Sequence, residues 1–407
     1  MSESILNASR VELDRAAVVR WRNGVFLVFL ATGLTFSSWA ARLPRVRDEL
    51  GATTGQMGLV VLAMAIGSIV GLVASSHVLA RFGSQRTMAF FFALLGAGMV
   101  AAGMGVELVS YPLLAAGMVL AGLGMGTTDV AMNLNGAVAE RALGRTVMPL
   151  FHAFFSFGTM GGAGIGALAE LLGVGVGPQM AVLAVVLVAA VLVGVRWTQH
   201  ENSLDTRAEA DEPASTARDR LAVWRQPATI LIGLIVLGMA LAEGSANDWV
   251  ALAMVDGHQT SNAVGGAGLV VFVTAMTVGR VAGVWVLDRF GRVPVLRATA
   301  LVASVGLATT IFSPWTSLAF VGIALWGLGS SLGFPVGMSA AADDPRQAAA
   351  RVSAVATIGY VAFLVGPPVI GFLGEQVGIL HALLVVLVLV ALVAFVAPAA
   401  REQSLER

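Results

Sequence analysis

Twelve apolar runs, each about twenty residues long, constrain this chain of 407 residues more than any other feature of its sequence. The hydrocarbon core of a bilayer is about 30 Å thick, which about 20 residues of α-helix span. Backbone groups in lipid must be hydrogen-bonded within their own segment, so such runs form helices and not open sheets. Only 12% of the residues are charged, whereas soluble domains average about 25%. The sequence therefore predicts an all-α integral membrane protein with helices near 24–42, 56–79, 88–106, 113–136, 148–171, 178–196, 228–250, 266–286, 295–313, 317–339, 353–374 and 378–399.

Arginine carries all the positive charge of the side chains other than histidine, because none of the 24 basic residues is lysine. An even number of spans puts both termini on one side, and 20 of the arginines fall on that side. The opposite side has Arg42, Arg45 and Arg47, and Arg280 lies within the eighth helix. Basic residues collect in cytoplasmic loops. We therefore expect a multi-pass protein of the cytoplasmic (inner) membrane with both termini in the cytoplasm.

Several kinds of chemistry are disfavoured by what the chain lacks. It has no cysteine, its five histidines are scattered without ligand spacing, and without lysine it has no phosphate-loop lysine or lysine Schiff base. The clusters GLGMG (122–126) and GLGSS (327–331) lie inside predicted spans with no preceding strand, so close helix packing explains them better than dinucleotide binding. We expect no enzyme activity, metal, cofactor or nucleic-acid partner.

The chain contains an internal repeat on either side of a charged segment, 197–227, that is predicted to be a cytoplasmic linker. The predicted domains are a cytoplasmic segment 1–23, a six-helix half 24–196, the linker, a second half 228–399 and a tail 400–407. Four collinear matches at shifts of 205 to 210 residues indicate that the halves are duplicated: GLVASSHVLARFGSQR (71–86) with GRVAGVWVLDRFGRVP (279–294), GLGMGTTDVAM (122–132) with GLGSSLGFPVG (327–337), GGAGIGALAE (161–170) with GPPVIGFLGE (366–375), and Trp39 with Trp249. Two pseudo-symmetric six-helix halves are typical of secondary transporters that bind substrate near the bilayer midplane.

One of these repeated loops carries a family resemblance. LDRFGR (287–292) resembles the signature loop of the major facilitator superfamily, and LARFGSQR (79–86) resembles its first-half copy. Four further stretches resemble fucose-permease-like bacterial inner-membrane proteins: ARLPRVRDELG (41–51), TDVAMNLNGAVAE (128–140), FHAFFSFG (151–158) and AEGSANDW (242–249). The resemblance covers residues 20–400 and implies a central cavity lined by helices one, four, seven and ten. It also implies that the loops near the cytoplasm gate this cavity, through Arg81, Gly83, Arg280, Asp288, Arg289, Gly291 and Arg292.

The chain departs from the family pattern in four places. Ala80 stands where the first-half loop has an acid, and the arginine typical of helix four in proton-coupled drug exporters is missing. The Gly-Pro signature of exporters is absent from helix five, although VGPPVIG (365–371) appears on helix eleven. Helix one lacks the acid of fucose permease. The missing arginine of helix four and the missing Gly-Pro signature of helix five argue against a drug exporter.

Two acid-asparagine pairs interrupt the apolar spans, where an ionisable group costs roughly 3 kcal/mol. Glu243 and Asn247 are four residues apart on helix seven and share a face, as do Asp129 and Asn133 on helix four. By the family resemblance both pairs face a water-filled cavity, where they would bind the substrate through its hydroxyl groups and Asp129 and Glu243 would carry protons. The alternative is that both acids make hydrogen bonds between helices. Asp248 is expected at the solvated outer end of its helix.

Other polar and aromatic residues have open assignments. His152, on the same face as Ser156, is a proton relay or a packing contact, and Arg280 snorkels or pairs with Asp288. Trp39 and Trp249 stack on a sugar or anchor the protein at the membrane interface. Ser330 and Ser331 complete a binding site at a break at Phe334-Pro335, or that proline is a kink between packed helices.

The sequence thus predicts a secondary active transporter that moves a small polar, sugar-like solute by alternating access, with proton coupling. Its partners are a small-molecule substrate, protons and the lipid bilayer, and the fold can work as a monomer. One alternative is a proton-driven exporter of drugs or hydrophobic metabolites, for which an apolar, aromatic-lined pocket is expected. A second alternative is a membrane sensor that does not transport.

Overall fold

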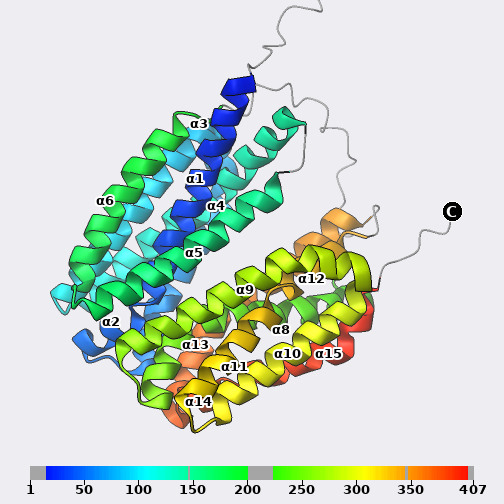
Figure 1. Cartoon of the computed structure of the whole chain (residues 1–407). Coiled ribbons are helices and arrows are strands. Elements are labelled where there is room, and N and C mark those ends of the chain that lie inside the picture. The colour runs from blue at the N-terminus through cyan, green and yellow to red at the C-terminus, as the bar shows by residue number, and fades with distance from the viewer. Residues whose placement is uncertain (1–14, 145–146, 200–222, 344–346, 402–407) are drawn as a thin grey trace, which may run out of the picture.

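The computed structural model describes residues 15–144, 147–199, 223–343 and 347–401, and every regular element in these ranges is a helix. Two helical bundles lie side by side (Figure 1), one from each half of the sequence. The N-terminal bundle contains α1 (Arg15–Ala40), α2 (Leu43–Leu50), α3 (Thr54–Glu107), α4 (Tyr111–Leu143), α5 (Met148–Leu171) and α6 (Val176–Val195). The C-terminal bundle contains α8 (Pro227–Leu252), η3 (Ala253–Gly257), α9 (Asn262–Phe290), α10 (Arg292–Phe312), α11 (Thr316–Ser330), α12 (Gly333–Ala341), α13 (Ala348–Val377), α14 (Ile379–Ala382), α15 (Leu384–Val396) and η4 (Ala397–Ala400).

Ten helical segments in the described part of the chain are long and apolar enough to cross a membrane. One of them, α3, contains two of the spans predicted from the sequence, because its helical conformation breaks only at Gly83. The helix α5 has the bounds predicted for the fifth span but is not among the ten. The all-α membrane fold is confirmed, and the count of twelve spans stays a prediction.

The sequence repeat is visible in the backbone of its two signature loops. Gly83 has φ 73° and ψ 163°, and its counterpart Gly291 has φ 75° and ψ 170°. Residues with a side chain rarely adopt this conformation, which explains glycine at both positions. The preceding arginines also match, since Arg81 lies 5.7 Å from the ring centre of Phe82 and Arg289 lies 5.8 Å from that of Phe290.

One local prediction needs correction, and two segments contain short helices that the sequence does not predict. The tenth predicted span breaks at Ser331-Leu332 and not at Phe334-Pro335, because Pro335 falls in the first turn of α12, where a proline costs no helical hydrogen bond. The last predicted span is divided at Leu383 into α14 and α15. The loop after the first span contains α2, which begins with Pro44 in its first turn.

Glycine lets α3 and α4 pack with their backbones in contact. A Cβ atom on Gly122 would collide with the carbonyl oxygen of Met64, and one on Gly67 would collide with that of Val119. Gly126 would likewise collide with the carbonyl of Ser68. The close packing predicted for the GLGMG cluster is therefore present.

The two bundles meet closely at one end of the molecule. Figure 1 shows them converging where α2 and α14 lie, and diverging toward the end at which α1 begins and η4 finishes. We call these the closed end and the open end. At the closed end Glu375 of α13 accepts hydrogen bonds from the backbone N–H of Gly55 and the hydroxyl of Thr53, both 3.1 Å long, at the first turn of α3.

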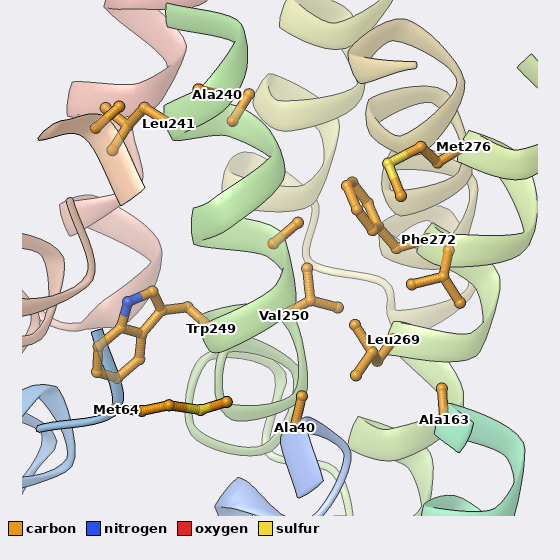
Figure 2. Close-up of a cluster of buried hydrophobic side chains, with 14 of the residues drawn as sticks. Ala40, Met64, Ala163, Ala240, Leu241, Trp249, Val250, Leu269, Phe272 and Met276 are labelled. Carbon is orange, nitrogen blue, oxygen red and sulfur yellow. The ribbon is translucent and has the colours of Figure 1, made fainter. Parts of the chain in front are cut away.

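Two further contacts from α2 join the halves at the closed end. Arg47 forms an ion pair with Asp256 of η3, and Asp48 accepts a hydrogen bond of 2.8 Å from Asn262 of α9. Beneath these polar contacts the halves share an apolar cluster (Figure 2), in which Trp249 reaches from α8 toward the N-terminal half. Its labelled members include Ala40, Met64 and Ala163 from one half and Trp249, Val250 and Leu269 from the other.

The α3–α4 contact gives a test of the packing. We expect Gly122→Ala to destabilise the protein by about 1–3 kcal/mol, since neither backbone can yield without moving a whole helix. The matched control is Gly164→Ala on α5, where an added Cβ meets no atom within 4 Å. Thermal unfolding in detergent should show a lower midpoint for the first variant and an unchanged or higher midpoint for the second. Equal midpoints would contradict the packing described here.

Candidate functional site

A cavity of about 290 Å³ lies between the two bundles. Residues of both halves line it, mainly with apolar and aromatic side chains. The N-terminal half contributes Phe36, Val61, Met64, Ala65, Ser68, Ile69, Leu72, Met125, Gly126, Asp129 and Phe155, and the C-terminal half contributes Gly244, Asn247, Asp248, Tyr360 and Phe363. The residues come from α1, α3, α4 and α5 on one side and from α8 and α13 on the other.

Polar groups are few in this lining. Asp129 accepts a hydrogen bond of 3.3 Å on Oδ1 from Asn133, which also donates to the backbone oxygen of Asp129 at 2.9 Å. The acid and amide of this predicted pair are therefore in contact, but only Asp129 lines the cavity. Across from it, α8 presents Asn247 and Asp248. Ser68 donates its hydroxyl proton to the backbone oxygen of Gly122 at 3.2 Å.

Glu243 lies outside the cavity lining. Both of its carboxylate oxygens accept hydrogen bonds from Nη2 of Arg280 on α9, at 2.8 and 2.9 Å. Arg280 also approaches the backbone oxygen of Ser331 at 3.4 Å. Of the predicted Glu243–Asn247 pair, only Asn247 therefore lines the cavity. The cavity meets the face of α8 that holds Gly244, Asn247 and Asp248. The structure also pairs Arg280 with Glu243 and not with Asp288.

The remaining predicted substrate contacts are buried elsewhere. Trp39 is 2% exposed and Trp249 is fully buried, and neither lines the cavity. Such burial does not fit membrane-interface anchoring, which requires an exposed ring. Ser330 and Ser331 are 1% exposed at the break after α11, and Ser331 donates to the backbone oxygen of Leu328 at 2.7 Å. Their contacts with a substrate stay a prediction.

The predicted gating loops lie at the open end. Arg292 donates to both oxygens of Asp343, at 2.8 and 2.6 Å, and to the hydroxyl of Ser339. Asp288 is exposed. His152 packs edge-on against Phe29 with ring centres 5.3 Å apart, and its backbone oxygen accepts the hydroxyl proton of Ser156 at 3.2 Å. It is exposed, in the second turn of α5, and does not line the cavity.

The prediction missed several residues that line the cavity. Asp248 was assigned to a solvated helix end, but α8 continues to Leu252 and Asp248 lies within it. The spacing of Gly244, Asn247 and Asp248, at i, i+3 and i+4, was the available signal for a common helix face. The contributions of α3 and α13, with Tyr360 and Phe363, had no signal in the sequence because the prediction placed only helices one, four, seven and ten around the cavity. The expected contribution of helix ten is absent from the lining.

The chemistry available at the cavity is that of its two carboxylates. Among the described residues, no group of three or more histidine, aspartate or glutamate side chains is arranged to hold a metal ion. Asp129 and Asp248 lie in the walls contributed by opposite halves, and either carboxylate can accept a proton or the donor group of a solute.

Comparison with known proteins supplies the family. The model of the Major Facilitator Superfamily matches residues 24–246 and 244–404. The chain is 30% identical over 357 residues to an uncharacterised MFS-type transporter of Yersinia pestis, covering 86% of this chain and 88% of that one. It also resembles two solved structures, which at such low identity show the fold alone. One is a mutant of the nucleoside transporter NupG (TM-score 0.76, 13% identity, 94% of this chain and 99% of that one covered), and the other is a variant of the E. coli fucose:proton symporter FucP (TM-score 0.62, 18% identity, 96% and 100% covered). The chain belongs to the Major Facilitator Superfamily of membrane transporters.

Proposed function

We propose that this protein is a proton-coupled secondary transporter that carries a small, largely apolar solute through the cavity between its halves. The observation that carries the proposal is the cavity itself, which contains residues of both halves and two carboxylates among apolar and aromatic side chains. In this proposal the closed end faces away from the cytoplasm and the open end faces it, as the arginine distribution predicts. Rocking of the halves then exposes the same cavity to the other side.

The cavity lining bears on the class of solute. The sugar-like solute expected from the sequence needs a partner for each of its hydroxyl groups, since unpaired polar groups in a closed site cost binding energy. The lining has few polar side chains, and its rings are those of Phe36, Phe155, Tyr360 and Phe363. This is the pocket expected for the alternative, a carrier of hydrophobic metabolites or drugs, and we favour that alternative on this ground.

A polar solute remains the second candidate, supported by the amide groups near the acids. Asn247 lines the cavity and Asn133 holds the carboxylate of Asp129, so a solute with two or three hydroxyls has partners there. NupG and FucP, which share the fold, are named for a nucleoside and for fucose with a proton. The transport panel below therefore includes both classes.

We assign the proton to Asp129 first. It lines the cavity and has an amide neighbour but no basic partner among the described residues, so protonation changes the charge that faces the solute. Glu243 has Arg280 as a partner, and its charge is already balanced. We assign Glu243 a structural role, in which it holds α8 against α9. The entrance of the cavity at the open end is assigned to His152, Arg292, Arg289, Arg81 and Asp288.

The role of Asp129 is testable by transport in proteoliposomes that contain the purified protein. A gradient of one pH unit supplies about 1.4 kcal/mol per proton and sustains about a tenfold accumulation of a coupled solute. We expect wild type to accumulate a member of a panel of aromatic amines, neutral aromatics, nucleosides and sugars. Asp129→Asn should keep exchange of labelled solute across the membrane and lose the accumulation driven by the gradient.

The control for this experiment is Glu107→Gln, which alters an exposed acid at the end of α3 that accepts a hydrogen bond from the backbone of Gly177. Accumulation by Asp129→Asn at the wild-type level would contradict the role of this residue. Failure of every solute to move with protons in wild type would contradict the proposed function itself.

The Glu243–Arg280 pair gives a separate test of a structural role. Arg280→Ala leaves the half-buried carboxylate without its partner, and we expect a loss of roughly 1–2 kcal/mol of stability, between the values for surface and buried pairs. The double variant Glu243→Met with Arg280→Met should recover most of this loss, because it leaves no unpaired charge. Unfolding midpoints in detergent measure both. A double variant less stable than the single one would argue that Glu243 has a further partner.

A further inference from the structure

The two carboxylates of the cavity have no positive charge to balance them. Among the described residues neither Asp129 nor Asp248 forms an ion pair, and no residue that lines the cavity is basic. Arg280 of α9 is already paired, because it donates to both carboxylate oxygens of Glu243. Two acids from opposite halves therefore face one small space without a counter-ion.

An ionised carboxylate in apolar surroundings is costly unless it gains a proton or a cation. Both acids lie on membrane-spanning helices, half-buried, and most side chains of the cavity are apolar or aromatic, the other polar ones being Ser68, Asn247 and Tyr360. Three other acids of the chain do have basic partners, in the pairs Glu243–Arg280, Asp343–Arg292 and Asp256–Arg47. The missing partner of Asp129 and Asp248 is therefore expected from outside the protein.

The aromatic residues of the cavity favour a positively charged guest. Cations bind over the faces of phenylalanine and tyrosine rings, with a gain of about 0.5–2 kcal/mol each. Phe36 and Phe155 belong to one wall and Tyr360 and Phe363 to the other. Acidic groups within an aromatic enclosure suit an ammonium group that carries an apolar body.

An unpartnered amide supports the presence of a ligand at the same place. Asn247 lies between Glu243 and Asp248 in the sequence of α8, is 9% exposed and lines the cavity. Its side chain forms no hydrogen bond with another described residue. Buried amides are rarely left without partners, so this group is available to a bound molecule.

The size of the cavity limits the guest. At about 290 Å³ it lies at the small end of sites for small organic molecules. A single aromatic ring with an amine or quaternary ammonium group fits such a space, whereas a sugar of similar size would leave hydroxyl groups facing leucine, isoleucine and valine side chains.

We propose that the cavity binds a small organic cation, an amine or quaternary ammonium compound with one apolar or aromatic body, through Asp129 and Asp248. This inference rests on the proposed function and names its substrate class. Proton and cation compete for the same carboxylates, so a carboxylate that receives the cation releases its proton. Each exchange replaces one positive charge by another, and the charge of the site stays constant. The coupling is therefore an exchange of cation for proton.

Binding to the purified full-length protein tests the cation directly. The probes are benzyltrimethylammonium, which is permanently charged, the neutral benzyl alcohol, and fucose. We expect the cation to bind at least about tenfold more tightly than benzyl alcohol, as loss of a partner from a desolvated charge pair typically produces such a change or more. In weakly buffered solution, binding of the cation should release protons, and its affinity should fall as the pH is lowered.

Variants identify the groups that respond. Asp129→Asn and Asp248→Asn should each weaken binding of the cation by at least about tenfold, reduce the proton release, and weaken binding of benzyl alcohol far less. Glu107→Gln, which lies outside the cavity, should bind all probes like wild type. Retained binding of benzyl alcohol also shows that the Asp variants are folded.

The possible failures are distinguishable. Equal binding of cation and benzyl alcohol, or full cation binding by both Asp variants, overturns the cation site. Proton-linked transport of a neutral aromatic without cation binding overturns it too, and leaves the proposed function standing. Proton-linked transport of fucose without cation binding overturns both the cation site and the apolar solute of the proposed function. Cation binding that depends on both acids, in a protein that moves no solute with protons, supports the site and overturns the proposed function.

Discussion

Contact between the two halves at the closed end is the constraint on which the rest of this structure depends. Glu375 of α13 lies at the first turn of α3 and accepts hydrogen bonds there, where the partial positive charge of the helix is concentrated. A Cβ on Gly55 would occupy the position of the Glu375 carboxylate. The ion pair of Arg47 with Asp256 adds a second attachment nearby. These contacts hold the bundles together at one end while they diverge at the other (Figure 1).

The closed end also creates the chemistry of the cavity. Closure brings α3 and α4 of one half toward α8 and α13 of the other, and so places Asp129 and Asp248 in walls of the same space. Neither acid has a basic neighbour in the described structure, while Glu243, one residue before the cavity-lining Gly244, has Arg280. Five residues along α8 therefore separate the balanced charge of Glu243 from the unbalanced charge of Asp248. We propose that a proton or a cation acts through these unbalanced acids.

Much of the fold could be predicted from the sequence, because the thickness of a bilayer sets helix length and a duplicated sequence folds twice. The paired glycines Gly83 and Gly291 have nearly the same backbone angles, as the repeat implies. The site was harder to predict. Periodicity placed Glu243 and Asn247 on one side of α8 but could not say which neighbour each meets, since a helix inside a bundle is surrounded by others. Glu243 pairs with Arg280, which lies 37 residues later in the sequence, and the sequence alone does not show that contact.

Alternating access is the central claim, and the distances between the halves at both ends test it most directly. The chain has no cysteine, so spin labels can be placed without background at Leu172 and Trp315 for the closed end and at Trp197 and Phe290 for the open end. Double electron-electron resonance on Glu375→Ala should show a longer distance at the closed end and a shorter one at the open end than in the protein that keeps Glu375. A longer distance at the closed end with no change at the open end, or no change at either, would contradict rocking of the halves about the cavity.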